Sequence, residues 1–292
     1  MNTATVMEGI AMVEFFGALG DPDLVFLRYA LLLSLLASVP LGAVGTLVVA
    51  RRISYLAAAI AHSALGGIGV ALYTKEALGW SWFSPMLGAL LSAVLSAALV
   101  GWVSLRARER EDAAIGAIWV SGMAIGLLSI YNTTGYVDPM GYLFGDILLV
   151  QLLDLKLAAV VGSVIILTLV LAYRPVVAVC FDPEFAAIRG VHSPWIYQLL
   201  LQMTALCVVL MVSLVGIVLV IALLTLPPAI ASLRARSLWQ MILGSIILTA
   251  LFLVVGLALS FTWNVPTGPV VILLAVFIYL VSLLAGRFRA KG

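Results

Sequence analysis

The chain has 292 residues, of which 64% are hydrophobic and only 10% are charged, and its mean hydropathy is +1.24. A soluble domain carries about 25% charged residues, and no soluble fold of this length hides so much apolar surface from water. The composition excludes a cytosolic enzyme, a nucleic-acid binder and a disordered protein. It predicts a protein of the lipid bilayer, whose small net charge of +2 matters less than where the charges lie.

Apolar runs between the charges predict spanning helices, because a helix needs about 20 apolar residues to cross the hydrocarbon core. Residues 1–23 carry four acidic residues and no basic ones, so we expect an extracytoplasmic tail and not a signal peptide. Nine segments follow, at 24–49, 54–74, 83–105, 113–131, 153–173, 195–214, 216–233, 238–260 and 267–286. The expected fold is an all-α polytopic bundle of about nine transmembrane helices over 24–286, with a tail at 287–292.

The basic residues predict the orientation of the bundle. With nine crossings the loops fall on two sides, and one side receives twelve basic residues while the other receives three. Lys and Arg mark the cytoplasmic side, so the N-terminus is expected outside and the C-terminus inside. The twelve are Arg51, Arg52, Arg106, Arg108, Arg110, Arg174, Arg189, Arg234, Arg236, Arg287, Arg289 and Lys291, and the three are Arg28, Lys75 and Lys156.

His62 lies near the middle of the predicted helix 54–74, between Ile60 and Gly67. An ionisable residue inside a membrane is a functional-site hypothesis by default, and burial favours the neutral imidazole, which is the form that binds a metal ion. One interpretation is a ligand or gate on an ion pathway. The other is a histidine that bonds to a backbone carbonyl or a nearby hydroxyl and serves only packing.

The loop at 174–194 contains a second informative stretch. Asp182 is a favourable N-cap and Pro183 fits the first helical position, Glu184 suits the N-terminal dipole, and Gly190 supplies a stop. These residues predict a short cytoplasmic helix near 182–190, with the apolar side chains of Phe181, Phe185 and Ile188 on one face. Such a helix fits a groove on a cytoplasmic partner, or it rests on the membrane surface.

Other chemistry is not indicated. No GxxxxGK[ST] sequence occurs, so ATP binding through a P-loop by the chain itself is not expected. Ser121 lies in Val120-Ser121-Gly122 without a GxSxG pattern, which argues against an intramembrane serine hydrolase. Cys180 and Cys207 have no CxxC spacing, so neither a disulfide framework nor a thiolate metal site is implied. The chain is expected not to be an enzyme.

Five stretches in order resemble one family, the permease subunits of bacterial ATP-driven importers for zinc, manganese and iron(II). They cover nearly the whole chain from about residue 25 to 286. The stretches are Arg51-Arg52-Ile53-Ser54-Tyr55 with Ile60-Ala61-His62-Ser63-Ala64-Leu65, Gly141-Tyr142-Leu143-Phe144-Gly145-Asp146-Ile147-Leu148, Asp182-Pro183-Glu184-Phe185-Ala186 with Gly190, Gly216-Ile217-Val218-Leu219-Val220 through Leu226-Pro227-Pro228-Ala229, and Pro266-Thr267-Gly268-Pro269.

The resemblance implies a permease of the bacterial inner membrane that forms a homodimer. Its implied partners are a cytoplasmic ATP-binding subunit, which hydrolyses the ATP, and an extracytoplasmic metal-binding protein. A divalent metal ion would be the transported substrate, with no tightly bound cofactor. The implied metal pathway comprises His62, Ser63 and Asn264, and the implied coupling helix comprises Asp182, Pro183, Glu184, Phe185, Ala186 and Gly190.

Two positions depart from the family pattern. Family members commonly carry an aspartate four residues before the signature histidine, where this chain has Ala58, and often another two residues before the Pro-x-Gly of the last helix, where it has Asn264. Both changes remove negative charge from a site for a dication. A pathway in which the ion must also leave needs only weak, transient sites.

Two other transport functions stay open on the sequence alone. A permease for iron-chelate or cobalamin cargo shares the general plan, although a wide channel without an intramembrane histidine suits that cargo better. A secondary carrier needs no ATPase, but it typically shows an internal repeat and paired ionisable residues in its helices, and neither is visible here.

Overall fold

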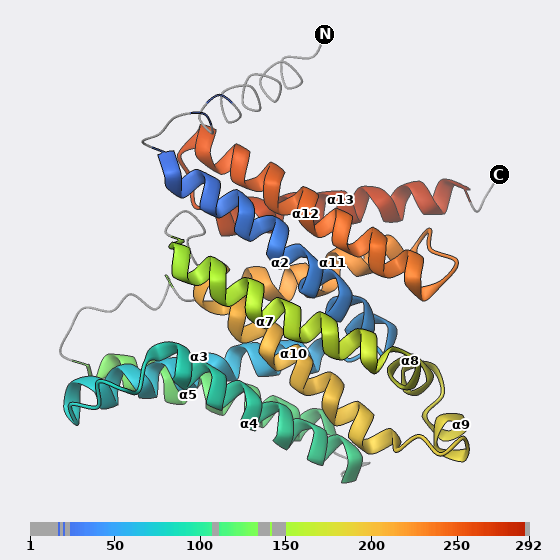
Figure 1. Ribbon diagram of the computed structural model, residues 1–292, viewed down its shortest axis with the longest axis horizontal. Coiled ribbons are helices and arrows are strands. Elements are labelled where there is room, and N and C mark those ends of the chain that lie inside the picture. Colours follow the sequence, from blue (N-terminus) through green and yellow to red (C-terminus); the bar gives the residue numbers. More distant parts are fainter. Residues whose placement is uncertain are drawn as a thin grey trace.

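The computed structural model describes residues 17, 20, 24–106, 111–133, 141 and 150–289. The named elements in these residues are α-helices (Figure 1). They are α2 (Val25–Ala50), α3 (Ser54–Ala77), α4 (Pro85–Arg106), α5 (Glu111–Tyr131), α7 (Leu152–Leu171), α8 (Tyr173–Phe181), α9 (Pro183–Ile188), α10 (Ser193–Val215), α11 (Ile217–Ser232), α12 (Leu238–Trp263) and α13 (Thr267–Arg289).

The all-helical membrane fold is confirmed, and each of the nine predicted segments coincides with a helix. Seven helices are long and apolar enough to cross a membrane, and shorter apolar stretches lie at Ile115–Tyr131 and Ile217–Ser232. One expectation was wrong: residues 174–181 are not loop but helix α8. Its Pro175 lies in the first turn, where the missing N–H is harmless, and Val176, Val179 and Cys180 are buried.

Several buried hydroxyl groups are satisfied inside their own helices, whereas the buried Ser245 hydroxyl has no partner among the described residues. In hydrocarbon each polar group must find a partner within the protein, and Ser and Thr do so by donating to the carbonyl four residues earlier. The side chains that make this bond at 2.7–2.9 Å are Ser34, Thr46, Ser63, Thr204 and Thr249. These residues therefore lie inside the bundle without breaking its helices.

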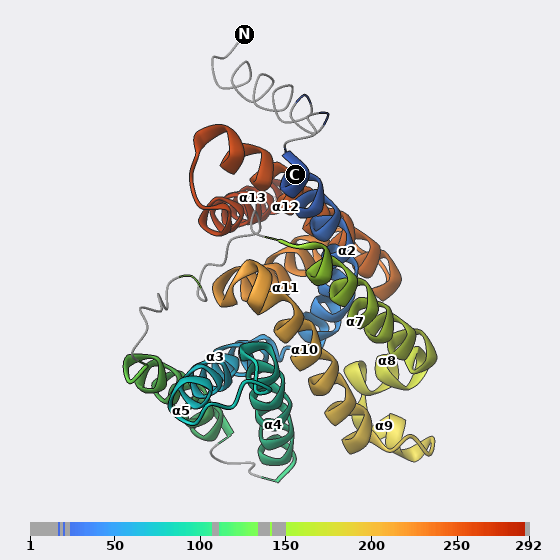
Figure 2. The ribbon, with the colours of Figure 1, turned by 60° about the vertical axis from the view of Figure 1, so that its left-hand side comes forward.

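Glycines bring α3, α4 and α5 into close contact. A Cβ atom on Gly66 would lie 2.7 Å from the Gly122 carbonyl oxygen, and one on Gly126 would lie 2.6 Å from the Leu65 carbonyl oxygen. A Cβ on Gly67 would overlap the Gly88 carbonyl oxygen of α4. Because only glycine allows such approach, these three helices form one tightly packed group (Figure 2).

The remaining long helices form a second group around α2, which packs against α7, α11 and α12. Phe252 of α12 is completely buried there. Helix α10 contacts both groups, and its Gln198 and Gln202 side chains donate to the Ala97 and Val94 carbonyl oxygens of α4 at 3.1 and 3.3 Å. These two hydrogen bonds from side-chain amides, within a mostly apolar contact, hold α4 and the helices packed on it against α10.

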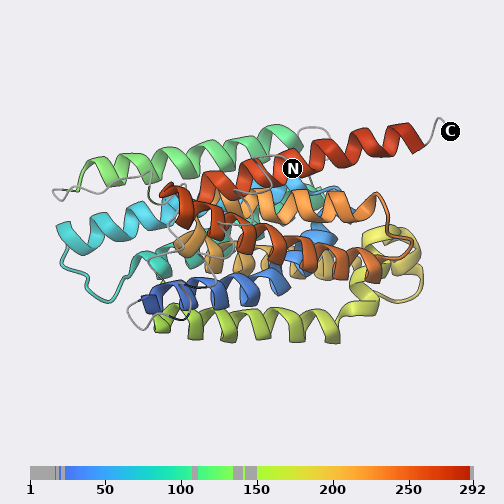
Figure 3. The ribbon, with the colours of Figure 1, turned by 90° about the horizontal axis from the view of Figure 1, so that it is seen from above.

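The long helices run roughly side by side, so their ends gather at two ends of the molecule (Figure 3). Helices α7 and α13 are the most exposed of the candidate spans, and they expose large apolar side chains such as Leu167, Val170, Leu273 and Phe277. Apolar residues on the outside of such a bundle are what a lipid environment requires.

Candidate functional site

His62 lies on α3 and is partly exposed. Its ring stacks on Trp119 of α5, with the ring centroids 4.8 Å apart and the planes within 12°. The buried Nδ1 atom has no hydrogen-bond partner among the described residues. A histidine held only for packing would be expected to use this atom, because buried polar groups are nearly always bonded.

Ser63 follows His62 in the sequence but belongs to the helix packing. Its hydroxyl donates to the Ala59 carbonyl oxygen at 2.8 Å, and its own carbonyl oxygen accepts a hydrogen bond of 2.5 Å from the Ser92 hydroxyl of α4. The Ser63 Cα also lies against Gly122 of α5. The hydroxyl is thereby committed to the protein backbone, and Ser63 contributes to the position of His62 through the packing of α3.

Asn264 is exposed and ends α12 in the left-handed backbone conformation, with φ 52° and ψ 47°. Asn tolerates this conformation better than most residues, which gives the side chain a structural reason to be there. Helix α12 packs on α2, α11 and α13, and Figures 1 and 2 place it on the opposite side of the molecule from α3. The structure therefore does not bring Asn264 and His62 together within one chain.

Ala58 is buried one turn before His62. Among the described residues, no group of three or more His, Cys, Asp or Glu side chains lies close enough together to hold a metal ion. The described part of a single chain therefore offers His62 as a lone imidazole and not a closed cage of ligands. Of the predicted mid-chain stretch 141–148, only Gly141 is among the described residues.

The short helix predicted near 182–190 is present as α9. The Asp182 carboxylate accepts a 2.9 Å hydrogen bond from the Phe185 N–H, and Pro183 is the first helical residue. Gly190 has φ 82°, with its N–H bonded to the Ala187 carbonyl and the next N–H bonded to the Ala186 carbonyl. This pair of bonds is the Schellman arrangement, and it explains why glycine stands at that position.

Most of the apolar face of α9 has no cover in the described structure. Phe181, Phe185 and Ile188 are 67%, 52% and 84% exposed, and the Arg189 guanidinium lies 5.2 Å from the centre of the Phe185 ring. Ala186 differs from them, because it is 1% exposed. Ala186 therefore packs α9 against the bundle. A bulky substitution there would displace α9 within the permease itself, before any effect on a docking partner.

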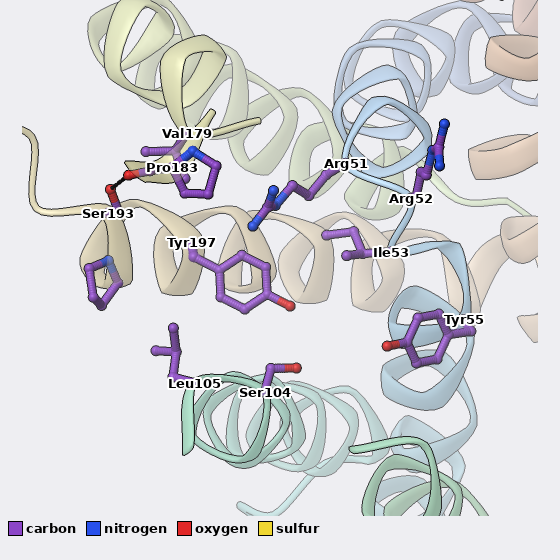
Figure 4. Close-up of a pocket in the computed structure, with 11 residues that line it drawn as sticks. Arg51, Arg52, Ile53, Tyr55, Ser104, Leu105, Val179, Pro183, Ser193 and Tyr197 are labelled. Carbon is purple, nitrogen blue, oxygen red and sulfur yellow. Dashed lines mark hydrogen bonds between the residues drawn. The ribbon is translucent and has the colours of Figure 1, made fainter. Parts of the chain in front are cut away.

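A pocket of about 340 Å³ lies directly beside α9 (Figure 4). The α2–α3 turn contributes Arg51 to it, α9 contributes Pro183, and α10 contributes Ser193 and Tyr197. The Arg51 guanidinium lies 5.8 Å from the centre of the Tyr197 ring. The Ser193 hydroxyl donates to the Pro183 carbonyl oxygen at 2.7 Å, which ties the start of α9 to the start of α10.

The α2–α3 turn orients Arg51. The Arg52 N–H bonds to the Val49 carbonyl and the Ile53 N–H to the Val48 carbonyl, so α2 ends in a second Schellman arrangement, with Arg52 at φ 61° where glycine is usual. Figure 4 shows the Arg51 side chain pointing toward Tyr197 and Pro183, whereas Arg52 points the other way. The Arg51-Arg52 pair was visible in the sequence, but the pocket beside it could not be predicted, because residues far away in the sequence line it.

Sequence reasoning also missed Trp119 as the neighbour of His62. The two residues are 57 positions apart, and the contact depends on the glycine-mediated approach of α3 and α5. The small residues Gly66, Gly69, Gly122 and Gly126 were the available signal, since such residues mark close helix contacts in membranes.

Comparison with known proteins gives consistent matches. A model of the ABC 3 transport family matches residues 23–286. An uncharacterized membrane protein of Synechocystis is 39% identical over 88% of this chain and 90% of its own length. The manganese import system permease protein ScaB of Streptococcus parasanguinis is 32% identical over 91% of this chain and 93% of its own length. The solved structure of PsaBC from Streptococcus pneumoniae in complex with Fab aligns with a TM-score of 0.80 at 30% identity, covering 93% of this chain and 95% of that one.

Proposed function

This chain belongs to the ABC 3 transport family, and we propose that it is the membrane permease of an ATP-driven importer that moves a divalent metal ion, manganese first among the candidates, into the cytoplasm. The full-length similarity to a manganese import permease supports the cargo. ATP hydrolysis is assigned to a separate cytoplasmic subunit, since the chain has no P-loop sequence. An extracytoplasmic binding protein would deliver the metal.

The proposed orientation places α9 in the cytoplasm. Nine basic residues in the described part of the chain belong to helix ends on the side of α9, and three belong to the other side, which the positive-inside rule assigns to the exterior. With nine crossings, the N-terminus is outside and the C-terminus inside. The nine are Arg51, Arg52, Arg106, Arg174, Arg189, Arg234, Arg236, Arg287 and Arg289, and the three are Arg28, Lys75 and Lys156.

The metal pathway is proposed to pass His62, and the observation that carries this is the unbonded Nδ1 atom. Stacking on Trp119 holds the ring in one orientation, and the residue is partly exposed, although its Nδ1 atom is buried within one chain. A neutral imidazole suits zinc and iron(II) and binds manganese more weakly, and one imidazole alone holds none of them tightly. A weak site is what conduction requires, because the ion must also leave.

The pathway is proposed to lie between two copies of the chain. The described residues of one copy supply a single imidazole and no group of three ligands, so a second copy would bring a second His62 to the same route. Asn264, exposed at the outer end of α12, is proposed as a weak oxygen ligand near the entrance. Ser63 acts on the pathway by holding α3 in place.

Substitutions at His62 test the proposal. His62→Phe keeps a ring that stacks on Trp119 but removes both nitrogens, so we expect it to lose most uptake of radioactive manganese while expression and binding of the ATP-binding subunit stay normal. His62→Ala removes the stack as well and serves for comparison, and Tyr73→Phe, at an exposed position of the same helix, is the matched control. Normal manganese uptake by His62→Phe would show that the residue serves packing and not transport.

A further inference from the structure

Neither the proposed metal pathway nor the proposed docking on α9 assigns a function to the positive charge of Arg51. Its side chain is half-buried and points into the 340 Å³ pocket beside α9. In the described structure it stacks on Tyr197, but no carboxylate is among the residues that line this pocket. A guanidinium carries five N–H donors in a fork that matches a carboxylate.

The position of the pocket links Arg51 to α9. Pro183 is the first residue of α9 and also lines the pocket. The hydrogen bond between Ser193 and Pro183 fixes α9 relative to the pocket. A protein that docks on α9 therefore also lies beside this pocket.

The cost of burying the Arg51 charge indicates which kind of partner side chain can cover the pocket. Covering the pocket with a neutral surface would remove Arg51 from water and leave it unpaired, which is strongly unfavourable. A carboxylate removes that penalty, and its pairing with Arg can be bidentate. The volume of the pocket is ample for one acidic side chain, and its lining combines the hydroxyl groups of Ser104, Ser193 and Tyr197 with apolar side chains such as Ile53, Leu105 and Val179.

We propose that the pocket beside α9 receives an acidic side chain of the ATP-binding subunit, which pairs with Arg51 when that subunit docks on α9. The inference rests on the proposed function, because it names the second contact of the same docking event. The Phe185 and Ile188 side chains supply apolar area, and Arg51 supplies charge recognition and register.

Affinity measurements supply the first test. The purified ATP-binding subunit of the importer is titrated onto the permease in nanodiscs of neutral lipid, at two salt concentrations. Arg51→Gln should raise the Kd about tenfold or more, as expected for a hydrogen bond between charged groups, and should weaken its salt dependence. Arg236→Gln is the matched control, since it removes one charge at the same end of the bundle but outside this pocket, and it should leave the Kd within about twofold.

A zero-length cross-link identifies the partner atom. Arg51→Lys keeps the positive charge and supplies an amine, which a carbodiimide couples to a carboxylate in contact with it, with loss of water. We expect mass spectrometry to find an amide between Lys at position 51 and an Asp or Glu of the ATP-binding subunit. This readout does not depend on whether Arg51→Gln folds.

The outcomes separate this inference from the proposed function. If the wild-type permease binds no ATP-binding subunit, both are wrong. If the wild type binds and Ile188→Ala weakens binding while Arg51→Gln does not, only the Arg51 contact is wrong. A cross-link to a carboxylate of the permease itself, binding that appears only when anionic lipid is added, or no cross-link to a subunit that binds Arg51→Lys normally would each also overturn the contact.

Discussion

Ile188 is the sharpest probe of docking on α9. It is 84% exposed, so truncation to alanine removes almost no contact within the permease, and the stability of the free protein should change by less than about 0.5 kcal/mol. If docking buries the side chain, Ile188→Ala loses three carbon atoms of apolar contact. At about 0.8 kcal/mol for each buried methylene, and with most of the side chain available, the loss is about 2 kcal/mol. This corresponds to a roughly 30-fold higher Kd for the ATP-binding subunit.

The assay compares two quantities on the same variant. The Kd is measured by titrating the ATP-binding subunit onto permease in nanodiscs, and the Tm of the permease alone reports its stability. Leu284→Ala is the matched control, because Leu284 is 56% exposed on α13, a helix that packs on α11 and α12. A Kd for Ile188→Ala within about twofold of wild type, with an unchanged Tm, would refute the assignment of α9 as the docking helix.

Three further predictions follow from packing, burial and orientation. Gly67→Ala should destabilise the permease by about 1–3 kcal/mol, seen as a lower Tm, because its Cβ would overlap α4, whereas Gly116→Ala, with nothing within 4 Å, should not. Burial raises the pKa of the Cys180 thiol to about 11, so at pH 8 only about one thiol in a thousand is the reactive thiolate; labelling in a variant without the other cysteine should be slow and should accelerate as pH rises toward 11. In spheroplasts of cysteine-free background, Lys75→Cys should react with an impermeant thiol reagent and Arg106→Cys should not, and the reverse pattern would invert the proposed orientation.

The helices could be predicted from the sequence because their signals are local. Apolar runs between charges gave segments that coincide with α2 to α5, α7 and α10 to α13, and the combination of Asp182, Pro183 and Gly190 gave both ends of α9. Capping depends on the residue itself and on the N–H and C=O groups within one turn. A prediction of this kind needs no knowledge of what packs against the helix.

The packing faces could not be predicted, because a bilayer removes the signal that reveals them. In water, the buried face of a helix is apolar and the outer face is polar, but here both the core and the lipid-facing side are apolar. The stacking of His62 on Trp119 and the burial of Ala186 therefore had no periodicity to indicate them. Ala186 resembled its exposed neighbours on α9, and only the contact of that helix with the bundle distinguishes it.

The cytoplasmic end of the proposed transport route poses an electrostatic problem for a positively charged metal ion. A dication that leaves His62 for the cytoplasm approaches the end of the bundle that gathers nine of the described basic residues, and their field opposes it. Screening limits the effect to charges within about 8 Å of the route at physiological ionic strength, and buried charges are screened less than exposed ones, so a half-buried Arg51 would oppose the ion if the route passes that close to it. Pairing Arg51 with a carboxylate of the ATP-binding subunit would neutralise that charge only in the assembled importer. The same contact that positions the ATP-binding subunit would then also lower the barrier to release of the metal.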